Sequence, residues 1–461
     1  MAIFSSLAGF FNRNKRRIFI TGAVSVSIYL LINEFIIKKF RNYQKTLRQE
    51  LIFKQQIKQR FIQTQQDCYY TILALLPVLA APIIDALPVE LITQALRLKK
   101  NNTKATNESN ELTSDNLNLL DNNNDPQSKL SIYMNKSKVE LWNLLKIKTI
   151  TRTLTLMYTI SGLLLITRLQ LNILARRSYL ESAIQMAGVK SINNDIDPHE
   201  NYIIEQSYLS LSWWLLNKGW ANLNSIIEAL VIQKFEKITP KSELTIEDFE
   251  NSLIDIINEI NLNNREYILA NLFPINYNDL LETLLNTNPD LVPHLDSADS
   301  NLIKLINETN SIMLDNNLYF FDLLNSLIVN NLTTLSTSLS FSLNAGNNLG
   351  NSLMTTTGNL AESSNKIREI SNTSYKLASF LAQLSVQNSI MIDNDNLKTE
   401  DVSPKHEPNL EEILQSLELP GGLDALEDTQ RNESCGNVYI NNLNELDELD
   451  DFSAGIYSNF E

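Results

Sequence analysis

The sequence has little glycine and little proline. Each occurs 12 times among 461 residues, so together they make less than half of the roughly 12% that is average. Sandwiches and barrels need these residues in their many tight turns, and the shortage therefore argues against an all-β fold. Long proline-free stretches rich in leucine, isoleucine, asparagine and lysine favour helices. The sequence predicts an all-α fold.

Cysteine and histidine are scarcer still. Cys68 and Cys435 form no CxxC pair, which excludes a disulfide framework and a zinc ribbon and favours a reducing compartment. The three histidines stand in the contexts DPHEN, VPHLD and PKHEP, without the spacing of a metal site. No GxSxG, P-loop or GxGxxG occurs. We expect no enzyme, no metal site, no cofactor and no nucleic-acid partner.

Charge is distributed unevenly along the chain. Residues 393–461 contain 18 acids and 3 bases, a balance of −15 that equals the net charge of the whole chain. Residues 38–60 contain eight bases and one acid. These bases either contact anionic lipid head groups or form a solvated helix face. An acidic tail of this kind is most often a solvated linker.

An apolar run near the N-terminus predicts a membrane anchor. Residues 18–33 are uncharged, and the run extends to Ile37 if Glu34 lies at the interface. About 20 residues at ~1.5 Å each span the ~30 Å hydrocarbon core. The alternatives are a cleaved signal peptide, which lacks small residues at a cleavage site here, and a buried soluble helix. Because bases lie on both sides of the apolar run, the positive-inside rule does not indicate which end of the anchor faces the cytosol.

A second apolar stretch, residues 153–167, is bounded by Arg152 and Arg168. Its 15 residues would span only about 22 Å, so we interpret it as the central buried helix of a bundle. Residues 101–129 are mostly Asn, Ser, Thr and Asp and predict a disordered insertion. The predicted organisation is a basic N-terminus (1–17), an anchor (18–37), a helical domain (38–392), an acidic linker (393–440) and a C-terminal segment (441–461).

Local signals predict several helices within this domain. Pro77, Pro82 and Pro88 should cut the end of the first helical part into short pieces, with a helix from residue 89 to 99. Residues 131–177 can form one nearly continuous helix. Residues 245–248 resemble a capping box, and Phe249, Leu253, Ile256 and Ile260 then share one face. Helices are uncertain over residues 330–375, and residues 410–419 are compatible with one short amphipathic helix in the acidic linker.

Tryptophans mark two stretches. Trp142 lies beside an apolar stripe that contains Leu141 and Leu145, with Lys138 and Lys146 one turn away on its own face. A tryptophan with a basic rim suits an amphipathic helix with acidic flanks; the alternative is a core tryptophan covered by lysine stems. The segment SLSWWLLNKGW (residues 210–220) predicts a buried face formed by Leu209, Trp213, Leu216 and Trp220, with Trp214 pointing elsewhere, exposed or at an interface.

Four stretches together resemble the peroxin-3 family, in particular its yeast members. They are residues 59–67 after the anchor, residues 139–142 leading to TRLQLNIL (167–174), residues 209–220, and the end of the chain, residues 450–460. The resemblance implies an integral peroxisomal membrane protein with a luminal N-terminus, an all-helical cytosolic domain and no enzymatic activity. The ER is an additional location that it implies during biogenesis.

The family docks the soluble receptor for new peroxisomal membrane proteins, peroxisomal biogenesis factor 19, through that receptor's N-terminal amphipathic helix. The resemblance therefore implies a role in membrane-protein insertion, peroxisome biogenesis and inheritance, with inheritance and pexophagy factors and membrane lipids as further partners. It places the groove tryptophan on Trp142, and implies a membrane-targeting segment at Arg13, Lys15, Arg16 and Arg17. The other groove residues that it implies are Lys138, Leu141, Leu145, Leu96 and Leu98.

A second class of function also fits the anchor and the helical domain. A signal-anchored tether or scaffold on the ER or mitochondrial surface needs only these two parts. The segments SLSWWLLNKGW and TRLQLNIL argue against it, because a generic tether has no reason to carry them.

Overall fold

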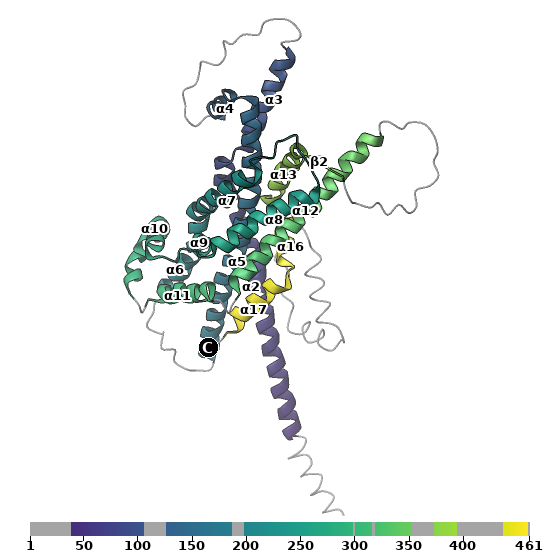
Figure 1. Cartoon of the computed structure of the whole chain (residues 1–461). Helices are drawn as coiled ribbons and strands as arrows, with labels where there is room; N and C mark the ends of the chain where they lie inside the picture. The colour runs from purple at the N-terminus through teal and green to yellow at the C-terminus, as the bar shows by residue number, and fades with distance from the viewer. Residues whose placement is uncertain are drawn as a thin grey trace, which may run out of the picture. The chain divides into compact units, whose positions relative to one another are not determined.

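The computed structural model of the chain describes residues 38–105, 126–186, 198–297, 300–315, 319–352, 373–393 and 437–459. These residues are helical apart from turns and one pair of two-residue strands, which confirms the all-α prediction (Figure 1). The predicted anchor (18–37) and the basic cluster from Arg13 to Arg17 lie outside the described residues. The chain divides into two compact units, residues 1–64 and 65–461. Of the first unit, the structure describes only residues 38–64, the basic start of helix α2 (Lys38–Ala86).

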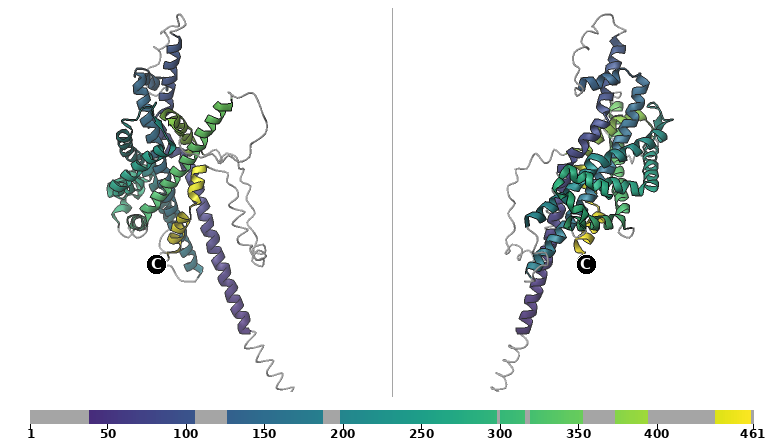
Figure 2. Two further views of the ribbon diagram at one scale, coloured as in Figure 1. Left: turned by 45° about the vertical axis from the view of Figure 1, so that its right-hand side comes forward. Right: turned by 90° about the vertical axis from the view of Figure 1, so that its left-hand side faces the viewer.

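Helix α5 (Lys138–Met186) is the core helix of the second unit. Every residue from Thr149 to Gln170 is buried, so the prediction of a central buried helix over residues 153–167 is confirmed. Figures 1 and 2 show other helices arranged around it. Its neighbours are α3 (Val89–Ala105), α7 (Trp220–Phe235), α12 (Phe320–Ser352), α13 (Leu377–Met391) and α17 (Asp447–Ser458).

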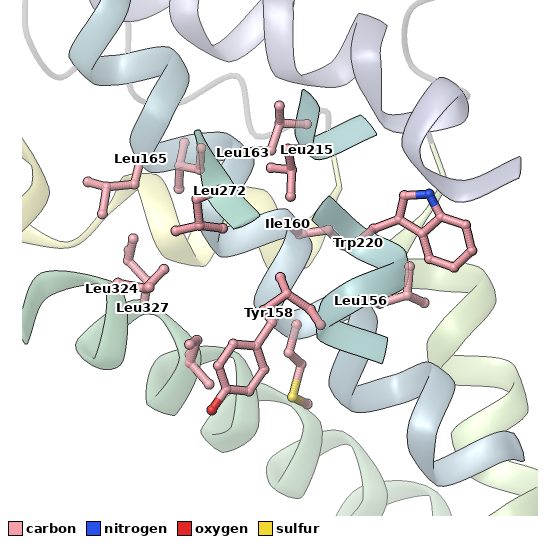
Figure 3. Close-up of a cluster of buried hydrophobic side chains, with 14 of the residues drawn as sticks. Leu156, Tyr158, Ile160, Leu163, Leu165, Leu215, Trp220, Leu272, Leu324 and Leu327 are labelled. Atoms are coloured by element: carbon pink, nitrogen blue, oxygen red, sulfur yellow. The ribbon is translucent and has the colours of Figure 1, made fainter. Parts of the chain in front are cut away.

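The remaining elements complete the second unit. They are α4 (Pro126–Met134), α6 (Pro198–Leu209), η3 (Ser210–Ser212), η4 (Leu215–Gly219), α8 (Ile246–Asn263), α9 (Arg265–Leu272), α10 (Tyr277–Thr287), η5 (Pro289–Asp296), α11 (Asn301–Leu314) and α16 (Val438–Asn444). Strands β1 (Glu243–Leu244) and β2 (Tyr375–Lys376) pair antiparallel, with Glu243 opposite Lys376. One large apolar core joins the helices of this unit apart from α3 and α4. Figure 3 shows side chains from α5, η4, α7, α9 and α12 converging in it.

Two described helices are long and apolar enough to cross a membrane, residues 54–86 and 138–184. In the helix of residues 138–184, 94% of the apolar 18-residue stretch is buried inside the protein. In the helix of residues 54–86, the corresponding share is 39%. The high burial agrees with the role of α5 as a core helix.

Helix α8 begins as the sequence predicts. The Thr245 side chain accepts a hydrogen bond from the Asp248 backbone N–H, and the Asp248 carboxylate accepts one from the Thr245 N–H. This is a complete capping box, which satisfies two backbone donors that the helix itself cannot pair. Phe249, Leu253, Ile256 and Ile260 are all buried, so the predicted apolar face is confirmed.

The prediction that prolines cut the first helical part into short pieces is wrong. Helix α2 continues through Pro77 and Pro82 to Ala86. A proline inside a helix costs one backbone hydrogen bond and causes a steric clash. Burial of Ile72, Leu76 and Ile83 on the opposite side of the helix outweighs this cost. Only Pro88 marks a boundary, since α3 begins directly after it.

The continuous helix predicted over residues 131–177 is interrupted. Helix α4 ends at Met134 and α5 begins at Lys138. The Ser137 N–H donates to the Glu140 carboxylate at 2.9 Å, and the Glu140 N–H donates to the Ser137 hydroxyl at 3.2 Å. This reciprocal pair is a capping box, so Ser137 starts a new helix where the apolar pattern alone would continue the old one.

The tryptophan segment departs from regular α-helix. A 3₁₀ turn covers residues 210–212 and a π-helical turn covers residues 215–219. Both turns change the rotation per residue, so side-chain positions counted at 3.6 residues per turn are shifted. Trp214, expected to point away, is buried and donates its indole N–H to the Ala270 carbonyl oxygen at 2.9 Å. Trp213, expected on the buried face, is only half-buried.

Some predicted boundaries differ from the observed helices. Residues 101–105 extend α3, and residues 126–129 belong to α4, so both ends of the predicted insertion are helical. The uncertain region beyond residue 330 is helical as far as Ser352. Helix α16 begins at Val438, inside the predicted acidic linker. The amphipathic helix predicted over residues 410–419 lies outside the described residues.

Candidate functional site

A second, smaller apolar core lies at the junction of α3, α4 and the start of α5, separate from the main core. Its buried members come from α3 and α5, and are Val89, Ile92, Ala95, Leu96, Leu141 and Leu145. Partly buried side chains from α4 and α5 cover it, and are Leu130, Tyr133, Met134, Trp142 and Leu144. Burial here raises the pKa of the Tyr133 hydroxyl. Figure 1 shows α4 beside α3 at this junction.

Trp142 lies in the second turn of α5 and packs against this small core. It is half-buried, so part of its indole stays accessible. A fully buried core tryptophan would offer a partner nothing, and a fully exposed one would have no fixed orientation. Half-burial on a packed support is the arrangement that an interface anchor requires.

The other predicted site residues divide into two groups. Leu141, Leu145 and Leu96 are buried, with exposed fractions of 0%, 7% and 7%. They belong to the small core on which Trp142 packs, and they are not accessible to a partner. Leu98 in the middle of α3 is 38% exposed, and Lys138 at the start of α5 is exposed. These two can touch a partner that covers Trp142.

Two exposed apolar residues at this junction were not predicted. Val139, three residues before Trp142, is 72% exposed, and Ile132 in α4 is 60% exposed. Helical spacing could have found Val139, because residues three apart are neighbours on a helix surface. No sequence signal marks Ile132, since its exposure depends on how α4 packs against α3.

Polar contacts hold the three helices together. The Lys99 ammonium donates to the carbonyl oxygen of Lys136 and thereby joins the end of α3 to the turn before α5. Arg152 of α5 donates to Glu90 in the first turn of α3 at 2.7 Å. The hydrogen bonds from the backbone and hydroxyl of Ser137 lower the pKa of Glu140, so the capping box persists at neutral pH.

The junction is basic. Helices α3 and α4, the turn between α4 and α5, and the first turn of α5 contain two acids, Glu90 and Glu140, against seven bases, Arg97, Lys99, Lys100, Lys104, Lys129, Lys136 and Lys138. A surface of this sign attracts acidic partners and steers their approach.

Lys146 does not belong to the basic rim that the sequence suggests. Its side chain is buried, and its ammonium donates to the carbonyl oxygens of Phe235 and Ile238, each at 2.7 Å. The end of α7 therefore binds this lysine inside the protein, and burial lowers its pKa. Lys138 is the one lysine of the predicted pair that remains at the surface.

Within the part of the chain that the structure describes, no three His, Cys, Asp or Glu side chains gather as a metal site would require. The exposed apolar side chains and the bases of the junction offer apolar contact and charge attraction to a partner.

Comparison with known proteins identifies the family of the chain. The family model described as Peroxin-3 matches residues 9–459. The chain belongs to the peroxin-3 family. It is 50% identical to peroxisomal biogenesis factor 3 of Debaryomyces hansenii over the full length of both chains. Membership of the peroxin-3 family gives the chain a role in peroxisome biogenesis.

More distant relatives match over part of the chain. The peroxisomal membrane protein PEX3 of Komagataella phaffii is 40% identical over 55% of this chain and 59% of its own. Peroxisomal biogenesis factor 3 of Saccharomyces cerevisiae is 32% identical over 59% of this chain and 64% of its own. The names of these peroxin-3 relatives describe biogenesis and membrane proteins, not enzymes.

Proposed function

We propose that the α3–α4–α5 junction docks the soluble receptor for new peroxisomal membrane proteins, peroxisomal biogenesis factor 19, through that receptor's N-terminal amphipathic helix. One observation supports this most directly: a half-buried tryptophan, Trp142, packs on its own small core, and Val139, three residues before it on the same helix, is exposed. Residues three apart are neighbours on a helix surface, so Trp142 and Val139 together offer an apolar surface to a partner.

The basic character of the junction selects the partner. An amphipathic helix with acidic flanks would place its apolar face over Trp142 and its carboxylates near bases such as Lys138. Apolar contact with the indole supplies most of the affinity, because aromatic anchors dominate interface energies. The surrounding charges chiefly set orientation and the rate of association.

We propose further that residues 18–37 anchor the chain in the peroxisomal membrane, with residues 1–17 in the lumen and residues 38–461 in the cytosol. Arg13, Lys15, Arg16 and Arg17 would serve in targeting. Anchoring keeps the docking surface at the bilayer, so capture of a cargo-loaded receptor raises the local concentration of cargo there. Docking of inheritance and pexophagy factors is part of the same proposal, without assigned residues. Protease protection of tags at the two ends of the chain in isolated organelles tests the orientation.

A binding titration tests the docking proposal. The full-length protein in lipid nanodiscs is titrated with the receptor's N-terminal helix peptide, and Trp142→Ala is measured in parallel. We expect Trp142→Ala to weaken binding by about 2 kcal/mol, roughly 30-fold, as for an interface hot spot. Val139→Asp should weaken it too, because a carboxylate beside the indole repels an acidic helix.

Matched controls separate docking from general damage. Trp213 is also half-buried but lies outside the junction, so Trp213→Ala should bind the peptide as the wild type does. Val386 in α13 is 52% exposed, and Val386→Asp controls for Val139→Asp. Equal binding by wild type and Trp142→Ala would place the docking site elsewhere. A folded wild-type protein that does not bind the peptide at all would contradict the proposed function.

A further inference from the structure

The last described part of the chain, residues 437–459, returns to the core as a pair of short helices, α16 and α17. We call this segment the clasp. It packs on α5, α12 and α13. Six of its apolar side chains are buried, namely Tyr439, Ile440, Leu443, Leu449, Ile456 and Tyr457. In the sequence, segment 394–436 lies between α13 and the clasp.

Asn437 joins the ends of two helices. Its side-chain amide nitrogen donates to the carbonyl oxygens of Ile390 and Met391 at 2.9 Å and of Asp393 at 3.0 Å. Its amide oxygen accepts from the backbone N–H groups of Tyr439 and Ile440. The last carbonyls of a helix and the first N–H groups of another lack partners within their own helices. One asparagine therefore satisfies the end of α13 and the start of α16 together.

Two further side-chain pairs connect α16 to its neighbours through hydrogen bonds. The Tyr439 hydroxyl donates to Gln387 of α13 at 2.7 Å, and Tyr69 of α2 donates to Asn441 at 2.8 Å. Both Tyr439 and Gln387 are buried, so a mismatch at this pair would leave polar atoms without partners and cost free energy.

Helix α17 matches its surroundings in charge. Its first turn contains Asp447, Glu448 and Asp450. Arg168 of α5, which is buried, donates to Asp450 at 3.2 Å and to Asn444 at 2.8 Å. Arg176, two turns further along α5, donates to the carbonyl oxygen of Ile456 near the end of α17. Arginines thus meet the acidic start and the carbonyl end of this helix, which favours one direction of docking.

The covalent connection does not by itself fix this placement. Asp393 and Asn437 are in hydrogen-bond contact, so the two residues that flank segment 394–436 lie side by side. A chain of that length at roughly 3.3 Å per residue could span more than ~100 Å, far beyond what the contact requires. A hollow of about 530 Å³ also lies between α16 and α12, and Thr333, Thr337 and Val438 are among the residues that border it.

We propose that the surface beneath the clasp is a peptide-binding site in its own right. It is filled by the chain's own end, and it accepts the same segment from a second copy of this chain. Side-chain recognition places the clasp: Asn437 at the end of α13, Tyr439 at Gln387, and α17 between Arg168 and Arg176. The length of segment 394–436 permits exchange between copies.

The test uses the full-length protein with a site-specific protease sequence inserted between residues 405 and 425. After cleavage of the folded protein, the C-terminal fragment should stay with the body in gel filtration. A fluorescent peptide of residues 437–459, added in excess overnight, should replace it. Release of the fragment on cleavage without uptake of the peptide would overturn the proposal, as would failure of the peptide to exchange.

Two peptide variants test the recognition itself. Asn437→Asp keeps the acceptor that starts α16, since aspartate is as good an N-cap as asparagine, but it removes the donor to the α13 carbonyls. We expect at least about tenfold weaker uptake. Glu448 is exposed, so Glu448→Gln should be taken up as wild type is. Equal uptake of Asn437→Asp and wild type would show that the contacts to α13 do not select the clasp.

Discussion

The ammonium group of Lys146 lies 2.7 Å from the carbonyl oxygen of Phe235, the last residue of helix α7. The carbonyls at the end of a helix lack partners within it, and a positive charge there interacts favourably with the helix dipole. Lys146 therefore closes the end of α7 from inside the protein. This contact fixes α7 against α5 one helical turn beyond Trp142.

Replacing this lysine should destabilise the fold. Lys146→Met keeps the apolar stem but removes the ammonium donor from both carbonyls, so that the Phe235 oxygen keeps only the backbone N–H of Ile238, at 3.2 Å. We expect the free energy of unfolding in urea to fall by about 2–3 kcal/mol. Lys148 pairs with Glu228 at 2.7 Å where both side chains are about one-quarter exposed, so Lys148→Met should cost under ~1 kcal/mol. Equal losses would contradict the role of Lys146.

The two adjacent tryptophans should lose different amounts of stability when each is changed to phenylalanine. Trp214→Phe removes the donor to the Ala270 carbonyl in a buried site, and we expect a loss of about 1–2 kcal/mol in the free energy of unfolding. Trp213→Phe, half-exposed, should cost under ~1 kcal/mol. Thermal unfolding of the two variants, measured in parallel, checks this order. The reverse order would indicate that Trp213 is the buried residue and Trp214 the exposed one, as regular helical spacing predicts.

Glycine to alanine should have opposite effects at two positions. A Cβ on Gly219 would collide with the backbone carbonyl oxygen of Asn271, so α9 and the π-helical turn would have to separate. We expect Gly219→Ala to lose about 3 kcal/mol or more. Around Gly455 in α17 a Cβ meets nothing within 4 Å. Gly455→Ala should therefore stabilise the fold by up to about 1 kcal/mol through helix propensity; a destabilised variant would contradict the open space there.

The buried thiol of Cys68 should make stability depend on alkaline pH. Burial raises its pKa from 9.0 to about 12, so above pH 9 the unfolded chain loses this proton while the folded chain keeps it. The native state then binds more protons, and stability falls as pH rises from about 9 towards 12. Under reducing conditions, the stability of wild type relative to Cys68→Ala should drop by about 1 kcal/mol between pH 9 and pH 10. A constant difference would place the thiol in contact with solvent.

Periodicity and capping signals in the sequence were sufficient where helices are regular. The capping box at Thr245 and the face that includes Phe249 and Ile260 follow from spacing alone, as does the burial of residues 153–167. The same reasoning failed at Pro77 and Pro82, where packing of the opposite face outweighs a local penalty. It failed at Trp213 and Trp214, because turns of 3₁₀ and π type change the phase of the helix.

The candidate site was predictable to a smaller extent. Trp142 and Lys138 could be singled out from one stretch of sequence and from a resemblance to a family. Whether Trp142 is half-buried depends on α3 and α4 as well as α5. The inward direction of Lys146 depends on Phe235, which is 89 residues further along the chain. Contacts across such sequence distances leave no local pattern.

The depth at which α5 is buried has a consequence for synthesis on the ribosome. Three of its partners, α12, α13 and α17, follow it in sequence, and α17 ends only at Ser458. Nascent chains emerge from the N-terminus onward, so an apolar helix long enough to cross a membrane stays partly uncovered until α17 has left the ribosome. The cell must keep this helix out of membranes and away from other nascent chains during that interval.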